Sequence, residues 1–156
     1  MKLDERIAFQ FAEAWSMLRD AIAPCDDEAW RAPTDGFSNI ARLAYHVVET
    51  VDDYVHEDLD AFPWAERFGI DWETDNLAAL PTPEEIDSYI AEAEAKAAAW
   101  IADLGQDGLL EPDAVFHKEG MSLLDRALYV LRHTQHHIGE IASVLRLRGI
   151  PRPAWR

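Results

Sequence analysis

The sequence predicts an all-α fold, a four-helix bundle formed by one domain over residues 1–156. Apolar residues recur with the 3.6-residue period of a helix in four stretches, and no stretch alternates with the period of a strand. Capping and stop signals bound these stretches. Of the 156 residues, 49% are hydrophobic, which is enough to form a core. Long amphipathic helices in this number most simply form a bundle.

The first expected helix covers residues 3–23. Its apolar face consists of Leu3, Ile7, Phe11, Ala14, Trp15, Leu18 and Ile22. Pro24 and the acidic residues that follow it end this helix. We expect a short connector next, with a turn at Thr34-Asp35-Gly36.

The second expected helix covers residues 39–59, with Ser38 as its N-cap and His46 at the margin of its apolar stripe. Periodicity is then lost from residue 60 to residue 80. Connections of this length are usually functional or packed across the body of a protein. Trp64 and Trp72 favour packing. We therefore expect a long crossover between the second and third helices.

The third expected helix covers residues 82–104. Thr82 and Glu85 have the spacing of a capping box, Pro83 suits the first helical position, and Gly105 marks the end. A loop follows from residue 106 to residue 120. The fourth expected helix then covers residues 122–148, with Ser122 as its N-cap and Gly149 as its C-cap.

The charge balance excludes two classes of partner. The chain has 14 basic and 30 acidic residues, a net charge of −16, so we expect no binding to nucleic acid or to an anionic membrane surface. Cys25 is the only cysteine, which excludes an intrachain disulfide. The N-terminus is charged, and no apolar run approaches the roughly 20 residues of a membrane helix. We expect a cytoplasmic protein.

Three of the six histidines lie within residues 133–137. On a helix, His133 and His137 are separated by about 40° of rotation and about 6 Å along the axis, so both imidazoles can bind one metal ion. A third ligand must come from another helix. His46 is the best candidate, because His56 lies near the end of its helix and His117 lies in a loop.

Three histidines with remaining positions open to water form the arrangement of a catalytic metal site. Glu49 and Glu140, each one turn from a candidate ligand, could be further ligands or could orient an imidazole, and His136 is a candidate for the groups around the site. Each could equally be a solvated side chain, and His46 could be an ordinary hydrogen-bonded histidine. The spacing of His46 to Glu49 and of His137 to Glu140 also leaves a two-metal carboxylate site as a lesser alternative.

The sequence resembles the DinB-like, or DinB/YfiT-like, family of metalloenzymes. The resemblance lies in residues 36–46, 124–125, 133–141 and 145–151, in the same helix order. Its most specific part is a histidine on the second helix, His46, combined with His-x-x-x-His on the last helix at His133 and His137. A glycine and a polar residue, Gly139 and Glu140, follow that motif.

The resemblance implies that His46, His133 and His137 bind a divalent metal ion, zinc or nickel, in a four-helix bundle that often forms homodimers. It also implies a small-molecule substrate and, in some members, a low-molecular-weight thiol such as bacillithiol or mycothiol. The family commonly has Arg-Gly-Gln after the last histidine, whereas this chain has Ile138-Gly139-Glu140. That difference bears on whether a thiol cofactor is used.

Two functions follow from these observations. The first is a metal-dependent enzyme of the thiol-transferase or hydrolase type, in which the ion acts as a Lewis acid. The second is a non-catalytic metal-binding stress-response bundle, in which the ion stabilises the fold. A helical dimer whose histidines only pack is a third interpretation.

Overall fold

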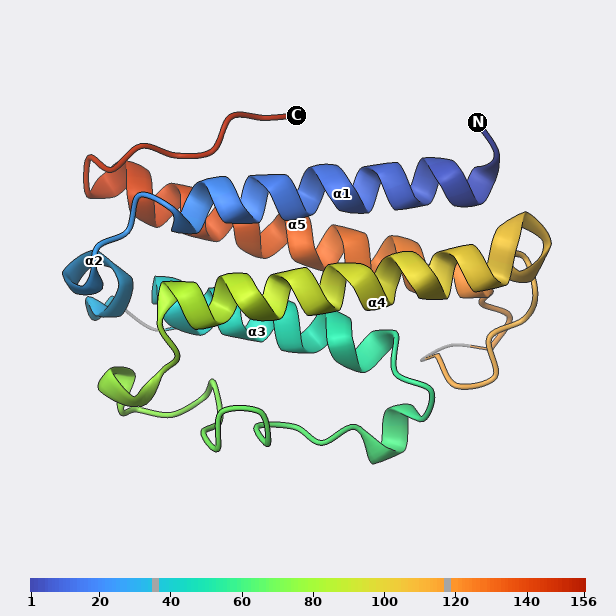
Figure 1. Cartoon of the computed structure of the whole chain (residues 1–156), viewed down its shortest axis with the longest axis horizontal. Coiled ribbons are helices and arrows are strands. Elements are labelled where there is room, and N and C mark those ends of the chain that lie inside the picture. The colour runs from blue at the N-terminus through green and yellow to red at the C-terminus, as the bar shows by residue number, and fades with distance from the viewer. Residues whose placement is uncertain (35–36, 117–118) are drawn as a thin grey trace.

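The computed structural model describes residues 1–34, 37–116 and 119–156. Four long helices form a bundle (Figure 1): α1 (Leu3–Ile22), α3 (Ile40–Tyr54), α4 (Pro83–Leu109) and α5 (Leu123–Leu147). α1 and α3 each pack mainly against α4 and α5, so α1 and α3 occupy opposite corners. Within the described residues there is no strand, and an isolated bridge joins Pro112 to Ser122. The predicted all-α bundle is confirmed.

Two of the three predicted helix N-caps are confirmed. Thr82 and Glu85 form a capping box at the start of α4, and Ser122 forms another with Asp125 at the start of α5. The predicted cap of α3 is wrong by one residue. The Asn39 side chain, instead of that of Ser38, accepts the hydrogen bond from the Arg42 amide. Both residue types are good caps, so the local sequence does not distinguish them.

The structure corrects the second helix, which ends at Tyr54 instead of residue 59. The His56 ring accepts a hydrogen bond from the Asp58 amide, and the Asp58 side chain accepts one from the Asp60 amide. These local side-chain bonds offer the backbone an alternative to the helix. The short helix η1 (Leu59–Ala61) follows.

Two further differences concern the connector and the end of α4. The expected connector contains a short helix, α2 (Asp27–Arg31), whose N-cap is Asp26. α4 runs to Leu109, beyond the predicted end at residue 104. The backbone nevertheless leaves the helical conformation at Gly105, where φ is 58°, and then resumes it. A glycine adopts this left-handed φ readily, so the predicted stop is a kink.

The chain between α3 and α4 returns from one end of the bundle to the other, so α3 and α4 point in the same direction (Figure 1). This segment, residues 55–82, is called the connection below, and it includes η2 (Leu77–Ala79). It is attached to α3 at successive turns. The Arg42 guanidinium donates to the carbonyls of Trp72 and Thr74, and the Tyr45 hydroxyl lies 3.1 Å from the Ile70 carbonyl oxygen.

The core contains residues from all four long helices and Trp30 of α2. α3 is the most enclosed of them, with 12 buried residues among its 15. None of the described helices is both apolar enough and long enough to cross a membrane. Asp35 and Gly36 of the predicted turn, and His117 of the predicted loop, lie outside the described residues.

Candidate metal centre

The structure brings the imidazoles of His46, His133 and His137 together between α3 and α5. The Nε2 atom of His133 lies 3.1 Å from Nε2 of His46 and 3.1 Å from Nε2 of His137. One ligand atom from each ring lies within 4.8 Å of those from the other two. His46 and His133 are 87 positions apart in the sequence. The packing of α3 against α5 therefore forms the cluster.

Burial keeps two of these imidazoles neutral. Burial, with a smaller contribution from the nearby His137, lowers the pKa of His46 to about 4. Burial also lowers the pKa of His133 to about 3, with smaller contributions from His137, His46 and His136. A metal ligand must be a neutral imidazole with a free lone pair. At neutral pH, His46 and His133 already have that charge state.

The second ring nitrogen fixes the tautomer of His137. Nδ1 of His137 lies 2.6 Å from Oε2 of Glu140, so Nδ1 carries the proton and donates it to the carboxylate. The Nε2 atom of His137 then carries a lone pair that points toward His133. Nδ1 of His46 lies 3.4 Å from the Thr50 hydroxyl, which can either donate or accept.

Hydrogen bonds alone satisfy this arrangement poorly. A ring nitrogen holds either a proton or a lone pair, so Nε2 of His133 cannot donate to one neighbour while accepting from the other. Nδ1 of His133 is buried and has no hydrogen-bond partner among the described residues. A cation at the centre of the three rings would accept all three lone pairs. The donor set therefore fits a metal ion better than it fits a hydrogen-bonded cluster.

The distances fit as well. Nitrogen ligands at about 2.0–2.1 Å from an ion lie about 3.3 Å apart in tetrahedral geometry and about 2.9 Å apart in octahedral geometry. The 3.1 Å distances of His133 to His46 and to His137 fall between these values. Three histidines leave at least one position for water or substrate, which is the open arrangement of catalytic sites.

Aromatic residues border the cluster on the side of the connection. The Trp72 ring lies 4.3 Å from the His46 ring, and the Phe37 ring lies 5.2 Å from Trp72, between ring centroids. The Arg42 guanidinium holds the Trp72 backbone and lies 5.0 Å from the Phe37 ring. Arg42 thereby fixes the tryptophan against a candidate ligand. On the other side, the Tyr129 ring stacks at 6.3 Å from His133.

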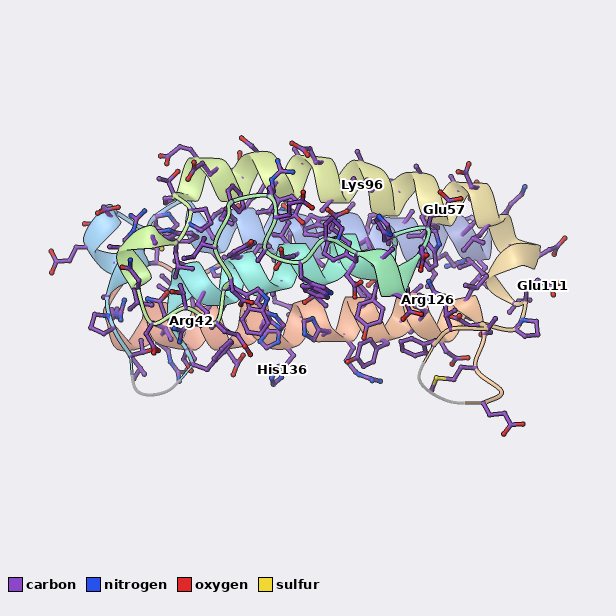
Figure 2. All side chains as sticks on the ribbon, turned by 90° about the horizontal axis from the view of Figure 1, so that it is seen from below. Arg42, Glu57, Lys96, Glu111, Arg126 and His136 are labelled. Carbon is purple, nitrogen blue, oxygen red and sulfur yellow. The ribbon has the colours of Figure 1, made fainter. Side chains whose placement is uncertain are left out.

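The structure separates the three candidates for surrounding groups. Glu140 contacts the site through His137. The His136 side chain is 67% exposed and points away from the bundle (Figure 2), although its ring lies 5.0 Å from that of His137. The Glu49 carboxylate instead accepts hydrogen bonds from the Tyr45 hydroxyl and the Ala65 amide. Of these three candidates, Glu140 is the one that is hydrogen-bonded to a ring of the cluster.

Arg42 is the neighbour that the sequence analysis missed. A signal for it existed, because Arg42 is a charged residue four positions before His46, within the apolar first half of the expected helix. Its partners could not be inferred, since they are backbone carbonyls of the connection. Trp72 was expected only as one of several aromatic residues in that connection.

A family model described as the DinB superfamily matches residues 10–141. The matched region contains His46, His133 and His137. Neither a curated protein nor a solved structure gives a match.

Proposed function

The chain belongs to the DinB superfamily, and we propose that His46, His133 and His137 together bind one divalent metal ion in an open site. The observation that carries this proposal is the convergence of three ring nitrogens from two helices, at distances that hydrogen bonds alone cannot all satisfy. Hydrogen-bonded histidines that only pack would be expected to pair their ring nitrogens one to one.

Imidazole ligands suit zinc and nickel, and these are the ions we propose. Three neutral ligands leave the two positive charges of such an ion uncompensated, which favours an anionic or ionisable fourth ligand. When bound, the ion would act as a Lewis acid and lower the pKa of a thiol or a water at its open position. A small-molecule reaction of the thiol-transferase or hydrolase type is consistent with this chemistry.

The chain's own residues prepare the site. Glu140 accepts the proton of His137 Nδ1 and so holds that ring with its Nε2 lone pair directed inward. Ile138 is buried in the core, so no cation occupies the position that follows the last histidine. The aromatic rings of Trp72 and Phe37 would exclude water from one side of the substrate.

A non-catalytic role is the second candidate, because the three rings join α3 to α5 and an ion between them would stabilise the folded state. Thermal unfolding before and after metal removal distinguishes the two roles. A melting temperature that hardly changes favours the enzyme, and a metal-free protein that unfolds favours the structural role.

The metal proposal is tested by elemental analysis of the protein purified without a histidine tag, together with its His137→Ala variant. We expect about one ion per chain in the parent and almost none in the variant, with far-ultraviolet helicity retained. His136→Ala is the matched control, because it removes an exposed histidine beside the same helix turn and should keep the ion.

Full metal content in His137→Ala would contradict the proposal. For the reaction, the metal-loaded protein would be screened with low-molecular-weight thiols against electrophiles and with hydrolysable esters. Turnover that depends on both the ion and a thiol supports a transferase, and turnover with the ion alone supports a hydrolase.

A further inference from the structure

A cavity of about 290 Å³ lies between α5, α1 and residues 149–156, which are called the tail below. Its volume is just below the usual range for small-molecule sites, so it suits a small ligand. Figure 1 shows the tail running back along α1 after the end of α5. The Ile150 amide donates to the Leu145 carbonyl, and the Arg156 guanidinium donates to the Asp20 carboxylate at 2.6 Å. The tail is therefore attached to the bundle near both of its ends.

The charge of this cavity is opposite to that of the whole chain. Arg146, in the last turn of α5, and Arg152, in the tail, both line it. Neither side chain has an ion pair or a hydrogen bond with another described residue. No acidic residue is among the described residues that line the cavity, although the chain has 30 acidic and 14 basic residues. Two unpaired guanidinium groups thus border one small space.

Much of the remaining lining is apolar. Met17 of α1 and Ile138 of α5 are buried and lie on the inner side of the cavity. Pro153 and Trp155 border it from the tail. Trp155 is 80% exposed, so a ligand in the cavity would shield part of a large apolar ring from water. The cavity therefore combines positive charge with a flat apolar surface.

Gly139 gives a second, independent observation. It lies in the interior of α5, where glycine is less favourable than alanine. Its φ is not in the left-handed region, and a Cβ added there would meet open space. Neither the backbone conformation nor the packing of the chain therefore requires a glycine. Gly139 lines the cavity, so the missing side chain leaves room for a ligand.

We propose that this cavity binds a small organic anion, a carboxylate that carries a flat apolar group. The carboxylate accepts hydrogen bonds from Arg146 and Arg152, whose planar guanidinium groups match its geometry. The apolar group occupies the space beside Gly139 and packs against Trp155. Gly139 points about 160° away from His137 around the helix, so the site is separate from the histidine cluster and does not depend on metal binding.

The test is an NMR titration of the full-length protein with benzoate at about pH 7, where the carboxylate is ionised. Benzamide is the neutral match, benzylammonium is the cationic match, and acetate keeps the carboxylate without the ring. We expect saturable 1:1 binding of benzoate, with the largest shifts at the Gly139 amide and the Trp155 indole N–H. The other three probes should bind at least about fivefold more weakly.

The titration is repeated with zinc present, because benzoate could also bind to a metal ion. The shifts at Gly139 and Trp155 should be the same in both experiments. Benzoate bound to an ion at the histidine cluster would instead shift the residues around His46.

Three variants test the residues of the cavity. Arg146→Gln and Arg152→Gln each remove one charge from an exposed side chain and should weaken benzoate binding about threefold to fivefold. Gly139→Leu fills the cavity and should abolish saturable binding, and leucine favours the helix, so α5 should stay folded. Arg132→Gln is the matched control. It removes the same charge from an exposed position of α5 outside the cavity and should leave affinity nearly unchanged.

Three results would overturn the proposal. Benzamide or benzylammonium binding as tightly as benzoate would exclude recognition of an anion, and acetate binding as tightly would exclude the apolar contact. Unchanged benzoate affinity in all three variants, or shifts that cluster away from Gly139 and Trp155, would exclude this cavity. Absence of saturable benzoate binding would also exclude the ligand. If Gly139→Leu then converts a dimer to a monomer in sedimentation, a second copy of the chain fills the space instead.

Discussion

α5 carries two polar clusters, about two turns apart, that differ in how completely their hydrogen bonds are made. At its first turn, Arg126 donates twice to Asp113, at 2.5 and 2.6 Å, and once to the Tyr54 carbonyl. Asp113 also accepts from two backbone amides of its own loop. Further along, the rings of His133 and His137 share Nε2 contacts that cannot all be hydrogen bonds.

The difference distinguishes a cluster that stabilises the fold from the candidate metal site. The side chains of Arg126 and Asp113 are 7% and 1% exposed, and their bonds join the loop before α5 to α5 and, through the Tyr54 carbonyl, to α3. The histidine cluster is half-buried and also joins α3 to α5, but Nδ1 of His133 has no hydrogen-bond partner among the described residues. A polar group buried without its full set of partners is a reason to look for a missing ligand.

The largest expected effect on stability comes from breaking the complete cluster. Asp113→Ala leaves the buried Arg126 without its partner, and we expect a loss of about 3–5 kcal/mol in the free energy of unfolding. Urea unfolding of the metal-free protein measures it. Glu92→Ala is the control, because it breaks an ion pair whose carboxylate is 52% exposed and should cost at most about 1 kcal/mol. Similar losses in both variants would mean that the buried ion pair stabilises the fold no more than the exposed one does.

The same ion pair predicts a pH dependence. Burial raises the pKa of Asp113, but the hydrogen bonds from Arg126 and from the Val115 amide lower it by more, so its pKa lies below the ordinary 3.8. A carboxyl with a depressed folded-state pKa stabilises the fold fully above its unfolded pKa and loses that contribution as pH falls through the folded value. Urea midpoints should therefore drop below about pH 4. The drop should be smaller in Asp113→Ala.

A smaller effect is expected beside the incomplete cluster. Glu140→Gln keeps an acceptor for His137 Nδ1 but removes its charge, so zinc affinity should fall by about 10-fold or more. Competition with a chromophoric chelator measures this affinity, and the unfolding free energy of the metal-free protein should not change. Equal zinc affinity in parent and variant would show that Glu140 does not support the site.

The smallest effect on stability is expected from replacing the central ring of the histidine cluster. His133→Leu removes the ring whose Nδ1 has no partner, so the metal-free protein should stay within about 1 kcal/mol of the parent in urea unfolding. The same variant should lose its bound metal. A loss of stability as large as that of Asp113→Ala would mean that the histidines serve the fold.

Local sequence signals predicted most of the fold. The capping boxes at Thr82 and Ser122 lie at helix starts because their side-chain bonds involve residues only three positions apart. The ends of α3 and α4 were less predictable. α3 ends early because the His56 and Asp58 side chains bond to nearby backbone, which periodicity does not reveal.

The candidate site was predictable only in part, for a related reason. Helical spacing pairs His133 with His137, and the structure adds His46, as the sequence analysis expected; their role as metal ligands stays a prediction. The contacts of Arg42 and Trp72 depend on the path of the connection. This segment has no hydrophobic periodicity from which its path could be predicted. The ion pair of Asp52 with Lys96 likewise joins helices whose register the sequence does not specify.

The enclosure of α3 limits the amino-acid substitutions that this helix can accept. With α4, α5 and the connection on its sides, α3 has hardly any face on which substitutions could accumulate without touching a neighbour. Its buried charged residues Arg42, Glu49 and Asp52 each bind a group from outside the helix. Transplanting or redesigning α3, which carries His46, would therefore require the connection to be exchanged together with it.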